Sequence, residues 1–384
     1  MKVLSIGTDK KIFDENSNVR LRSSSYAEKA SQYHIVVFTL KKDALDEVHQ
    51  GNLHIYPTNS LSKLHYYFDA VAVAKKVARE NSLESKDTVI TTQDPFETGL
   101  VGKKLKSIYS FPLQVQVHTD FLSQHFRHSL LNKLRVKISK SVLPSADGIR
   151  VVSSFIRDSI LTNIHGVKAN ISVLPIYVDI EGIIKSVAKD DIRADFPEFK
   201  FTMVMASRLS PEKRIDLALH SVKKVFEKFP HSGLVICGAG REKSKLKSLA
   251  KKLGIEKNVR FAGWREDLIS YYKTANLFLL TSEYEGYGMT LVEAGASGCP
   301  IVTTKVGLAK TDLFQNNVNC FVCESHNAGC ISKAIIDLIS NNSLREVFSQ
   351  KMQEDLRKIS ITKEEYIERY VELLANIKKD GYKP

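Results

Sequence analysis

The sequence of 384 residues lacks any apolar run of about 18 residues, the length that a membrane-spanning helix requires. Tandem repeats and low-complexity tracts are also absent. Only five cysteines are present, and the opening stretch MKVLSIG is too short and too strand-like for a secretory signal peptide. We therefore expect a cytoplasmic protein in which all five cysteines are reduced thiols.

Acidic residues are relatively scarce, because 43 Asp and Glu stand against 56 Lys and Arg, a net charge of +13. Such an excess favours polyanionic partners: nucleic acid, phosphorylated ligands or an anionic membrane surface. No zinc-finger, KH or RRM signature is present, so the sequence predicts no nucleic-acid-binding module.

Between Asp120 and Asp147 acidic residues are missing altogether. Residues 121–143 combine basic and apolar side chains in one amphipathic segment. Such a segment suits either an anionic membrane surface or a core helix with a solvated basic face, and the sequence favours neither. Peripheral association with the inner face of the cell membrane therefore stays open.

Short apolar runs alternate with helical patterns along most of the chain. Runs rich in Val and Ile that are separated by helices indicate parallel strands buried on both faces of a sheet, the doubly wound α/β class. The length favours two such domains, each Rossmann-like. The predicted strands are VLSI, YHIVVFTL, LHIYP, TVITT, LQVQVH, GIRVVS and ISVLP, followed by FTMVMA, GLVICG, NVRFAG, LFLLT, PIVTT and NCFV.

The two series of strands meet in a charged segment that has no strand pattern before Phe201. We place the hinge near 179–196, an N-terminal domain at 1–180 and a C-terminal domain at 181–362. The last stretch, 363–384, is predicted to be an amphipathic helix that packs back on the N-terminal domain.

Residues that follow predicted strands are candidate site residues, because open parallel sheets bind ligands beyond the carboxyl ends of their strands. Arg208 comes just after FTMVMA, and Lys213 is predicted at the start of the next helix, after Pro211. A guanidinium and an ammonium group at a helix N-terminus suit a diphosphate, although a solvated basic turn would read the same way. Later strands are followed by Gly238, in a GAG turn, and by Trp264, the only tryptophan.

Two carboxylates lie in SEYEGYGMTLVEA, after the buried strand LFLLT. Glu285 lies where the strand ends, and Glu293 lies inside the next predicted helix. Such a pair is compatible with a general acid and base, a metal site, a ligand clamp or an ordinary solvated helix start.

Together, RLSPEK, the GAG turn, VRFAGW and EGYGMTLVEAGASGCPIVTT resemble the C-terminal, donor-binding domain of family 4 glycosyltransferases. The resemblance covers residues 201–339 well and the whole chain more loosely. It implies the GT-B fold, in which two Rossmann-like domains face each other across a cleft. It also implies retaining transfer of a sugar from a nucleotide-diphosphate sugar, such as a UDP- or GDP-sugar, to a glycan, glycolipid or lipid-linked acceptor, as in polysaccharide biosynthesis.

The resemblance assigns roles to the candidate residues. Arg208 and Lys213 would hold the diphosphate and stabilise its developing charge, so that neither a metal ion nor another cofactor is needed. Glu293 would accept hydrogen bonds from the ribose hydroxyls, and Glu285 would contact hydroxyls of the transferred sugar. The two acids would then act at opposite ends of the donor, unlike the closely spaced pair of a retaining glycosidase.

Further donor contacts follow from the same resemblance. Backbone N–H groups of the turn before the helix would face the sugar and the β-phosphate, and the strand exits would line the base pocket. The residues concerned are Gly286, Tyr287 and Gly288 for the turn, and Gly238, Phe261 and Trp264 for the strand exits.

The N-terminal half would supply the acceptor site. His118 ends the strand LQVQVH, and the resemblance implies that it reaches the donor sugar, although a strand-end histidine is equally compatible with a structural role. Candidates for the acceptor or the cleft are Asp94, Glu97 and Asp120.

The loop after Gly7 departs from the family, which usually has a glycine-rich loop near the donor phosphates. This chain continues TDKKIFDENSNVRLRSSS, where Arg20 and Arg22 are partial substitutes at best. The missing G-x-G-x-x-G motif also argues against a dinucleotide-dependent oxidoreductase.

Other readings remain. The same fold carries sugar phosphorylases and nucleotide-sugar epimerases, and a non-catalytic protein that binds membranes or nucleic acid is a weaker alternative. The segment CFVCESHNAGC has potential zinc ligands. A strand followed by a helix would point these side chains apart, so we predict no metal site and unbridged thiols. The potential ligands are Cys320, Cys323, His326 and Cys330.

Overall fold

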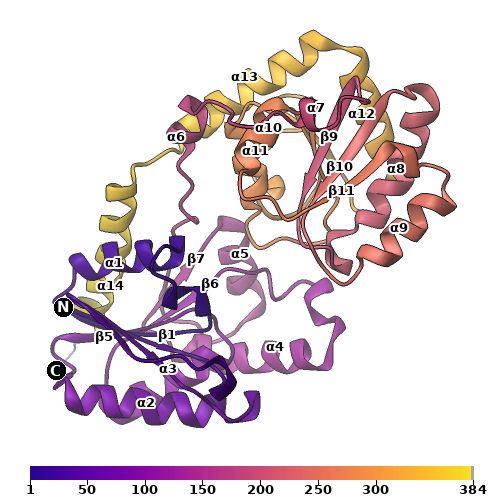
Figure 1. The fold of residues 1–384 in the computed structure, drawn as a ribbon. Coiled ribbons are helices and arrows are strands. Elements are labelled where there is room, and N and C mark those ends of the chain that lie inside the picture. The colour runs from indigo at the N-terminus through magenta and orange to yellow at the C-terminus, as the bar shows by residue number, and fades with distance from the viewer. Residues whose placement is uncertain (382–384) are drawn as a thin grey trace. The chain divides into compact units, whose positions relative to one another are not determined.

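A computed structural model describes residues 1–381, and the side chains of residues 1–377, as two compact units (Figure 1). Unit 1 comprises Met1–Pro175 and the described residues from Thr362 onward, and unit 2 comprises Ile176–Ile361. Each unit has a largely parallel sheet with helices on both faces, which confirms the predicted α/β class.

The sheet of unit 1 has the strand order β3-β4-β2-β1-β5-β6-β7-β8, in which only the β3–β4 pair is antiparallel. The strands are β1 (Lys2–Gly7), β2 (Gln32–Val37), β3 (Val48–Gln50), β4 (Leu53–Pro57), β5 (Thr88–Thr92), β6 (Leu113–Val117), β7 (Gly148–Val151) and β8 (Asn170–Val173). The α-helices are α1 (Asn18–Glu28), α2 (Tyr66–Glu80), α3 (Glu97–Tyr109), α4 (Leu130–Val142), α5 (Ser154–Asn163) and α14 (Lys363–Gly381). The short 3-10 helices are η1 (Lys10–Phe13), η2 (Lys41–Asp43), η3 (Lys63–His65), η4 (His125–His128) and η5 (Leu143–Ser145).

Helices cover both faces of this sheet, so central strands such as β5 and β6 are buried along their whole length. Helices α2, α3 and α4 pack side by side on one face, and α1 and α14 lie on the other (Figure 1). The ring of Tyr370 on α14 stacks on Tyr26, with centroids 4.3 Å apart, and its hydroxyl lies 3.4 Å from that of Tyr33. The C-terminal helix is therefore part of the core of unit 1, as predicted.

The sheet of unit 2 is fully parallel, with the order β11-β10-β9-β12-β13-β14. Its strands are β9 (Phe201–Ala206), β10 (Ser232–Cys237), β11 (Val259–Gly263), β12 (Leu277–Leu280), β13 (Ile301–Thr304) and β14 (Phe321–Cys323). Its α-helices are α6 (Ile180–Lys185), α7 (Ile192–Asp195), α8 (Ile215–Lys228), α9 (Lys243–Lys252), α10 (Leu268–Thr274), α11 (Met289–Ala296), α12 (Ala328–Ser340) and α13 (Asn342–Lys358). The 3-10 helices are η6 (Pro211–Lys213), η7 (Glu256–Asn258) and η8 (Gly307–Lys310).

Two details differ from the sequence-based expectation. Lys213 ends the 3-10 helix η6 instead of starting α8, because Arg214 adopts a left-handed conformation with φ of 46° and separates the two helices. The segment 179–196 contains α6 and α7, which pack within unit 2. The chain passes between the units at Pro175–Ile176 and again at Ile361–Thr362.

The cysteines also differ from expectation. Cys323, the last residue of β14, forms a disulfide with Cys330 in the first turn of α12, so the prediction of five reduced thiols is wrong for this pair. The intervening turn reverses the chain at His326, whose φ is 71°, and brings the two sulfur atoms together. Cys237, Cys299 and Cys320 are buried free thiols. Because two of the four potential zinc ligands are bonded to each other, they are not available to a metal.

Candidate active site

The candidate donor site lies where the connections of the unit 2 sheet change direction. Strands β10 and β11 follow β9 in the sequence and lie on one side of it in the sheet. The next strand, β12, lies on the other side of β9. Connections leave the carboxyl ends of β9 and β12 in opposite directions, and such a switch point is where open α/β sheets bind ligands. The loop after β9 carries Arg208 and Lys213, and the loop after β12 carries Glu285. The structure therefore brings both predicted segments together at the carboxyl end of the sheet.

Lys213 and Glu285 form an ion pair that joins the two loops. The Lys213 ammonium donates to Oε1 of Glu285 at 2.6 Å, and the Ser282 hydroxyl donates to the same oxygen at 2.6 Å. The side chains of Lys213 and Glu285 are only 14% and 13% exposed, so water screens the pair weakly. Sequence reasoning did not identify Ser282, although its position three residues before an acid is typical of local side-chain hydrogen bonds.

Arg208 differs from Lys213 in its surroundings. Its side chain is 77% exposed, and the nearest carboxylate is that of Glu212, at 3.7 Å. The two cations thus differ in their surroundings: the ammonium group of Lys213 is bound to a carboxylate, whereas the side chain of Arg208 extends into solvent beyond the end of β9. A diphosphate at this edge would meet Arg208 directly and would compete for, or share, the ammonium group of Lys213.

Helix α11 begins directly after the Glu285 loop. Its N-cap, Gly288, has φ of 94°, a conformation that favours glycine, and no side chain caps the helix. Within residues 1–381, no protein acceptor is bonded to the N–H groups of Gly288, Met289 and Thr290. These donors, together with the helix dipole, suit an anionic ligand. The side chain of Tyr287, in contrast, is buried in the core of unit 2.

Glu293 lies in α11, and burial raises the pKa of its carboxyl group. Burial and then the charge of Glu293 hold the pKa of Tyr272 well above its usual range. The hydroxyl of Tyr272 is fully buried and has no hydrogen-bond partner among the described residues. Glu293 is thus a mostly desolvated acceptor, as the predicted contact with ribose hydroxyls requires.

Gly238 has a structural reason to be glycine. Its φ is 136°, and a Cβ atom would lie 1.9 Å from the carbonyl oxygen of Ser207. Its N–H group donates to the carbonyl of Gly263 at 2.6 Å, so Gly238 ties together the exits of β9, β10 and β11. Beside it, Phe261 is half-buried in β11, and Trp264 is 70% exposed just beyond that strand.

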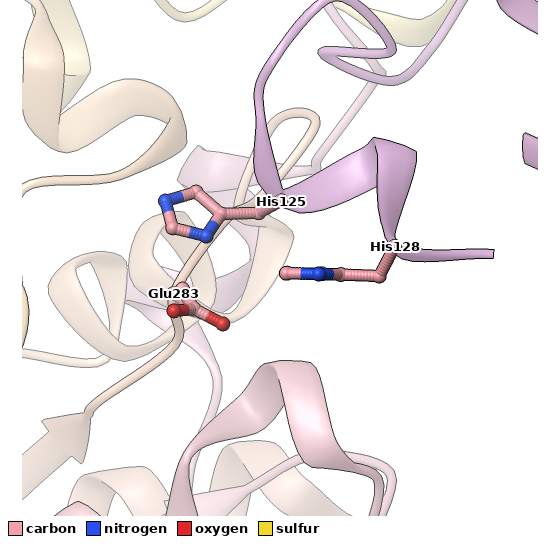
Figure 2. Close-up of side chains that lie close together, drawn as sticks. All are labelled: His125, His128 and Glu283. Carbon is pink, nitrogen blue, oxygen red and sulfur yellow. The ribbon is translucent and has the colours of Figure 1, made fainter. Parts of the chain in front are cut away.

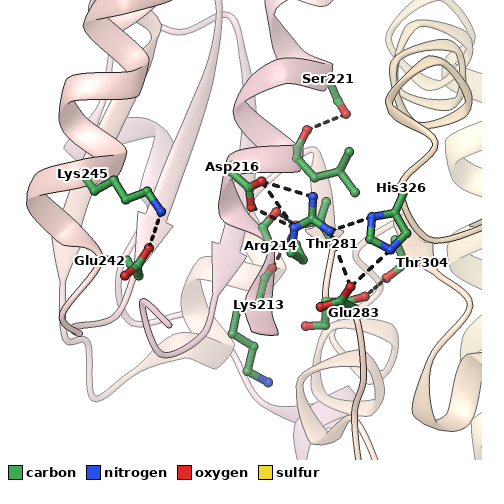
Figure 3. A network of polar contacts seen from close by, with 12 residues as sticks. Lys213, Arg214, Asp216, Ser221, Glu242, Lys245, Thr281, Glu283, Thr304 and His326 are labelled. Carbon is green, nitrogen blue, oxygen red and sulfur yellow. Dashed lines mark hydrogen bonds and ion pairs between the residues drawn. The ribbon is translucent and has the colours of Figure 1, made fainter. Parts of the chain in front are cut away.

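A network behind Lys213 holds the two loops in place (Figure 3). Arg214 bonds His326 Nδ1 at 2.7 Å, and Nε2 of His326 lies 3.2 Å from a carboxylate oxygen of Glu283. The hydroxyl of Thr281 donates to the carbonyl of Arg214 at 2.8 Å. The disulfide-closed turn therefore contacts both the Lys213 and the Glu285 segments. Sequence reasoning assigned no such role to Arg214, Glu283 or His326, which come from three separate loops.

Reduction of the Cys323–Cys330 disulfide is expected to destabilise unit 2. The bridge closes a loop between residues seven apart, and the loss of such a cross-link costs about 2–3 kcal/mol in the chain-entropy account. We expect dithiothreitol to lower the urea midpoint of unit 2 by a corresponding amount. A Cys323→Ser/Cys330→Ser double variant should unfold at this lower midpoint with or without dithiothreitol. An unchanged midpoint for the reduced wild-type protein would contradict the role of the bridge.

The corresponding switch point of unit 1 lies between β1 and β5. Gly7 ends β1, and a Cβ atom there would lie 3.2 Å from the side-chain oxygen of Gln93, which accepts the N–H of Thr8 at 2.7 Å. Arg20 does not substitute for the missing glycine-rich loop, because it is 2% exposed and donates to Gln50 and to the carbonyl of Ile12. Arg22 is exposed on α1.

The remaining N-terminal candidates follow β5 and β6. Asp94 accepts the N–H of Phe96 at 2.7 Å, and burial raises the pKa of Asp94 to about 6. Both oxygens of Glu97 accept from Nε of Arg135, at 2.9 and 3.1 Å. Asp120 is 5% exposed.

His118 stands just beyond β6, where burial and then the charges of Arg150 and Arg22 lower its pKa to about 3. The ring is therefore neutral at physiological pH, and its Nε2 lies 3.2 Å from the side-chain oxygen of Gln116.

Comparisons with known proteins agree with this architecture. Residues 25–181 match the sequence model described as Glycosyltransferase Family 4, and residues 188–355 match Glycosyl transferases group 1. The fold is similar to that of Anabaena Alr3699/HepE in complex with UDP and glucose, with a TM-score of 0.75 and 19% identity over 98% of this chain and 100% of that one.

Other relatives match shorter parts of this chain. The poly(glycerol-phosphate) alpha-glucosyltransferase of Bacillus subtilis is 29% identical over 174 residues, which are 45% of this chain and 26% of that protein. The alpha-monoglucosyldiacylglycerol synthase of Streptococcus pneumoniae is 27% identical over 241 residues, 60% of this chain and 53% of that protein. The first relatives are matched over only a quarter to less than half of their own length.

The two largely parallel sheets, the sequence matches on both of them and the similarity to HepE define the GT-B fold of glycosyltransferases. The chain belongs to the family 4 glycosyltransferases, with a group 1 C-terminal part.

Proposed function

We propose that the protein transfers a sugar from a nucleotide-diphosphate sugar to a glycan or lipid-linked acceptor, with retention of configuration and without a metal ion. The observation that carries the proposal is the Lys213–Glu285 pair at the switch point of unit 2. The pair holds a cation and a carboxylate within one hydrogen bond of each other, which supports a site where the cation would bind the diphosphate and the carboxylate the sugar.

The chemistry follows from the charges at this point. When the bond between the anomeric carbon and the phosphate oxygen breaks, negative charge grows on the diphosphate. Arg208, Lys213 and the first N–H groups of α11 would stabilise that charge in a poorly screened environment. Glu285 would hold hydroxyls of the sugar while its second partner, Ser282, keeps the carboxylate oriented. Glu293 would bind the ribose, and Phe261 and Trp264 the base.

The relatives support the choice of donor and stereochemistry. HepE was crystallised with UDP and glucose, and the name of the Bacillus subtilis relative specifies an α-linkage. UDP-glucose is itself α-linked, so formation of an α-linked product corresponds to retention.

A thermal-shift screen with UDP, GDP, ADP and their sugars tests donor binding. A ligand present at 100 times its dissociation constant stabilises the folded state by about 2.7 kcal/mol. We expect one nucleotide series to raise the unfolding temperature, equally with magnesium or with EDTA. Stabilisation by none of them, or only in the presence of a divalent ion, would contradict the proposal.

We further propose that unit 1 contacts an anionic membrane through the exposed side of α4. Leu130 is 84% exposed, Leu131 52% and Leu134 53%, and exposed lysines lie among them. A relative that synthesises a glucosyldiacylglycerol is consistent with a lipid acceptor. The α4 surface consists of Leu130, Leu131, Leu134, Lys133, Lys137 and Lys140. Within residues 1–381, none of the helices has the length and hydropathy of a transmembrane segment.

Other residues of the basic segment 121–143 are not part of the α4 surface. Phe126 is buried against Phe96, with ring centroids 5.6 Å apart, and Arg135 pairs with Glu97. His125 and His128 lie together on η4, with ring centroids 6.1 Å apart (Figure 2).

Co-sedimentation with vesicles that contain anionic lipid tests the α4 surface. Each lysine near such a surface contributes about 1 kcal/mol, so replacing Lys133, Lys137 and Lys140 by Ser should weaken binding about a hundredfold. Replacing the three exposed lysines Lys243, Lys247 and Lys251 on α9 is the matched control, because that helix has no exposed large apolar side chain. Binding that is absent, or insensitive to salt and to the α4 changes, would contradict the membrane contact.

A further inference from the structure

Arg150 is a buried cation without a carboxylate partner among the described residues. It is 4% exposed in β7, and its guanidinium is solvated by carbonyl, amide and hydroxyl oxygens. It donates to the carbonyls of Leu174 and Pro175 at 3.2 Å and to the hydroxyl of Tyr366 at 2.7 Å. Burying a charged group costs free energy, so we expect this arrangement to have a functional reason.

The fourth acceptor of Arg150, the side-chain oxygen of Gln116, connects it to His118. Nη1 of Arg150 donates to the side-chain oxygen of Gln116 at 2.8 Å, and the same oxygen lies 3.2 Å from Nε2 of His118. The amide nitrogen of Gln116 donates to Thr91 at 2.9 Å and to the hydroxyl of Tyr370 at 3.1 Å. Rotating the amide by 180° would set its NH₂ group against the guanidinium, so the orientation of Gln116 is determined by its neighbours.

An amide oxygen only accepts hydrogen bonds, so Nε2 of His118 must carry the proton. In a neutral ring Nδ1 then has a free lone pair, and no protein group in the described part of the chain is bonded to it. Arg150 and Arg22 are the charged groups that act on the ring, and both oppose its protonation. A neutral ring with its proton on Nε2 does not act as a general acid. Beyond the end of β6 it offers only Nδ1, a hydrogen-bond acceptor.

We propose that Gln116 and Arg150 are positioning residues that fix His118 as the neutral Nε2–H tautomer, so that Nδ1 accepts a hydrogen bond from a hydroxyl of the transferred sugar. The role of the sugar rests on the proposed function. The tautomer itself does not, and it is measurable without any substrate.

Nitrogen-15 NMR of the histidine rings tests the tautomer directly, with the His118 signals assigned by their loss in a His118→Asn variant. We expect a protonated Nε2 and an unprotonated Nδ1, unchanged between pH 5 and pH 8, because the pKa is lowered to about 3. A protonated Nδ1, or an imidazolium ring at pH 6, would overturn the inference and leave donor binding unaffected.

Gln116→Glu tests the positioning role. The new carboxylate would stabilise the imidazolium form, so the pKa of His118 should rise and the transfer rate should gain a step in its pH profile. Gln114→Glu is the matched control: Gln114 is also buried in β6 and is hydrogen-bonded to the same Thr91, but it makes no hydrogen bond with His118 among the described residues. A similar loss of stability is expected for both, and a changed His118 titration only for Gln116→Glu. Equal His118 titration in the two variants would overturn the role of Gln116.

His118→Asn separates the inference from the proposed function. Loss of one hydrogen bond to a neutral sugar hydroxyl should lower kcat about tenfold and leave the affinity for the nucleotide unchanged. Unchanged transfer by this variant, with the Nε2–H tautomer confirmed, would overturn the contact with the sugar but not the tautomer.

Discussion

Replacement of Glu285 by Gln is expected to lower the rate of sugar transfer at least about a hundredfold, while the affinity for the nucleoside diphosphate stays within about twofold. The amide keeps the size of the side chain but removes the charge that Lys213 and Ser282 bind at 2.6 Å. The sugar would then lose a strong acceptor, and Lys213 would no longer be aligned between sugar and phosphate. Transfer rates and calorimetric titration with the nucleotide measure the two effects separately.

Glu256→Gln is a suitable control for this variant. Glu256 is an exposed acid in η7, immediately before β11 and thus at the amino end of the strands of unit 2, so its neutralisation should change neither quantity. Equal losses of transfer rate and nucleotide affinity in Glu285→Gln would contradict the assignment of Glu285 to the sugar.

Replacement of Glu293 by Ala is expected to weaken nucleotide binding by about 1–3 kcal/mol, roughly five- to 150-fold, because hydrogen bonds from the ribose hydroxyls to a charged group are lost. The wild-type protein should therefore prefer a ribonucleotide to its 2′-deoxy analogue, and the variant should bind both with similar affinity. Calorimetric titration of both proteins with both nucleotides measures the four affinities that this comparison requires. A preference for ribose that survives in Glu293→Ala would contradict the contact.

The pH dependence of binding gives an independent check on Glu293. Burial raises the pKa of this carboxyl group, so the acceptor form is lost at a higher pH than for an exposed glutamate. Nucleotide affinity should fall as the pH is lowered toward that raised value, and Glu293→Ala should remove this dependence.

The strands of the fold were predictable because most of them are short apolar runs buried on both faces. The run TVITT, for example, is buried at every position of β5. Strand β3 was not predicted, since Val48–Gln50 is a short and largely exposed antiparallel edge without an apolar run. The predicted parallel topology implied that Arg208, Lys213 and Glu285 lie just beyond strand ends. In the structure all three lie at one switch point.

Features that depend on unusual backbone conformations or on distant partners were not predictable. The left-handed residue Arg214 shifts the start of α8, and the left-handed residue His326 brings Cys323 to Cys330; residues other than glycine adopt this conformation too rarely for the sequence to predict it. The environment of His118 is built by Gln116, Arg150 and Tyr370, which lie on three elements of unit 1. No spacing in the sequence connects them.

The most direct test of the central claim is to follow an isotopically labelled nucleotide sugar by NMR, in the presence of an acceptor and the purified protein. Retaining transfer predicts release of the nucleoside diphosphate together with a new glycoside that has the anomeric configuration of the donor, at a rate that Glu285→Gln lowers at least about a hundredfold. Formation of a sugar 1-phosphate that requires added phosphate, conversion of the donor into its epimer, or a product of inverted configuration would contradict the account.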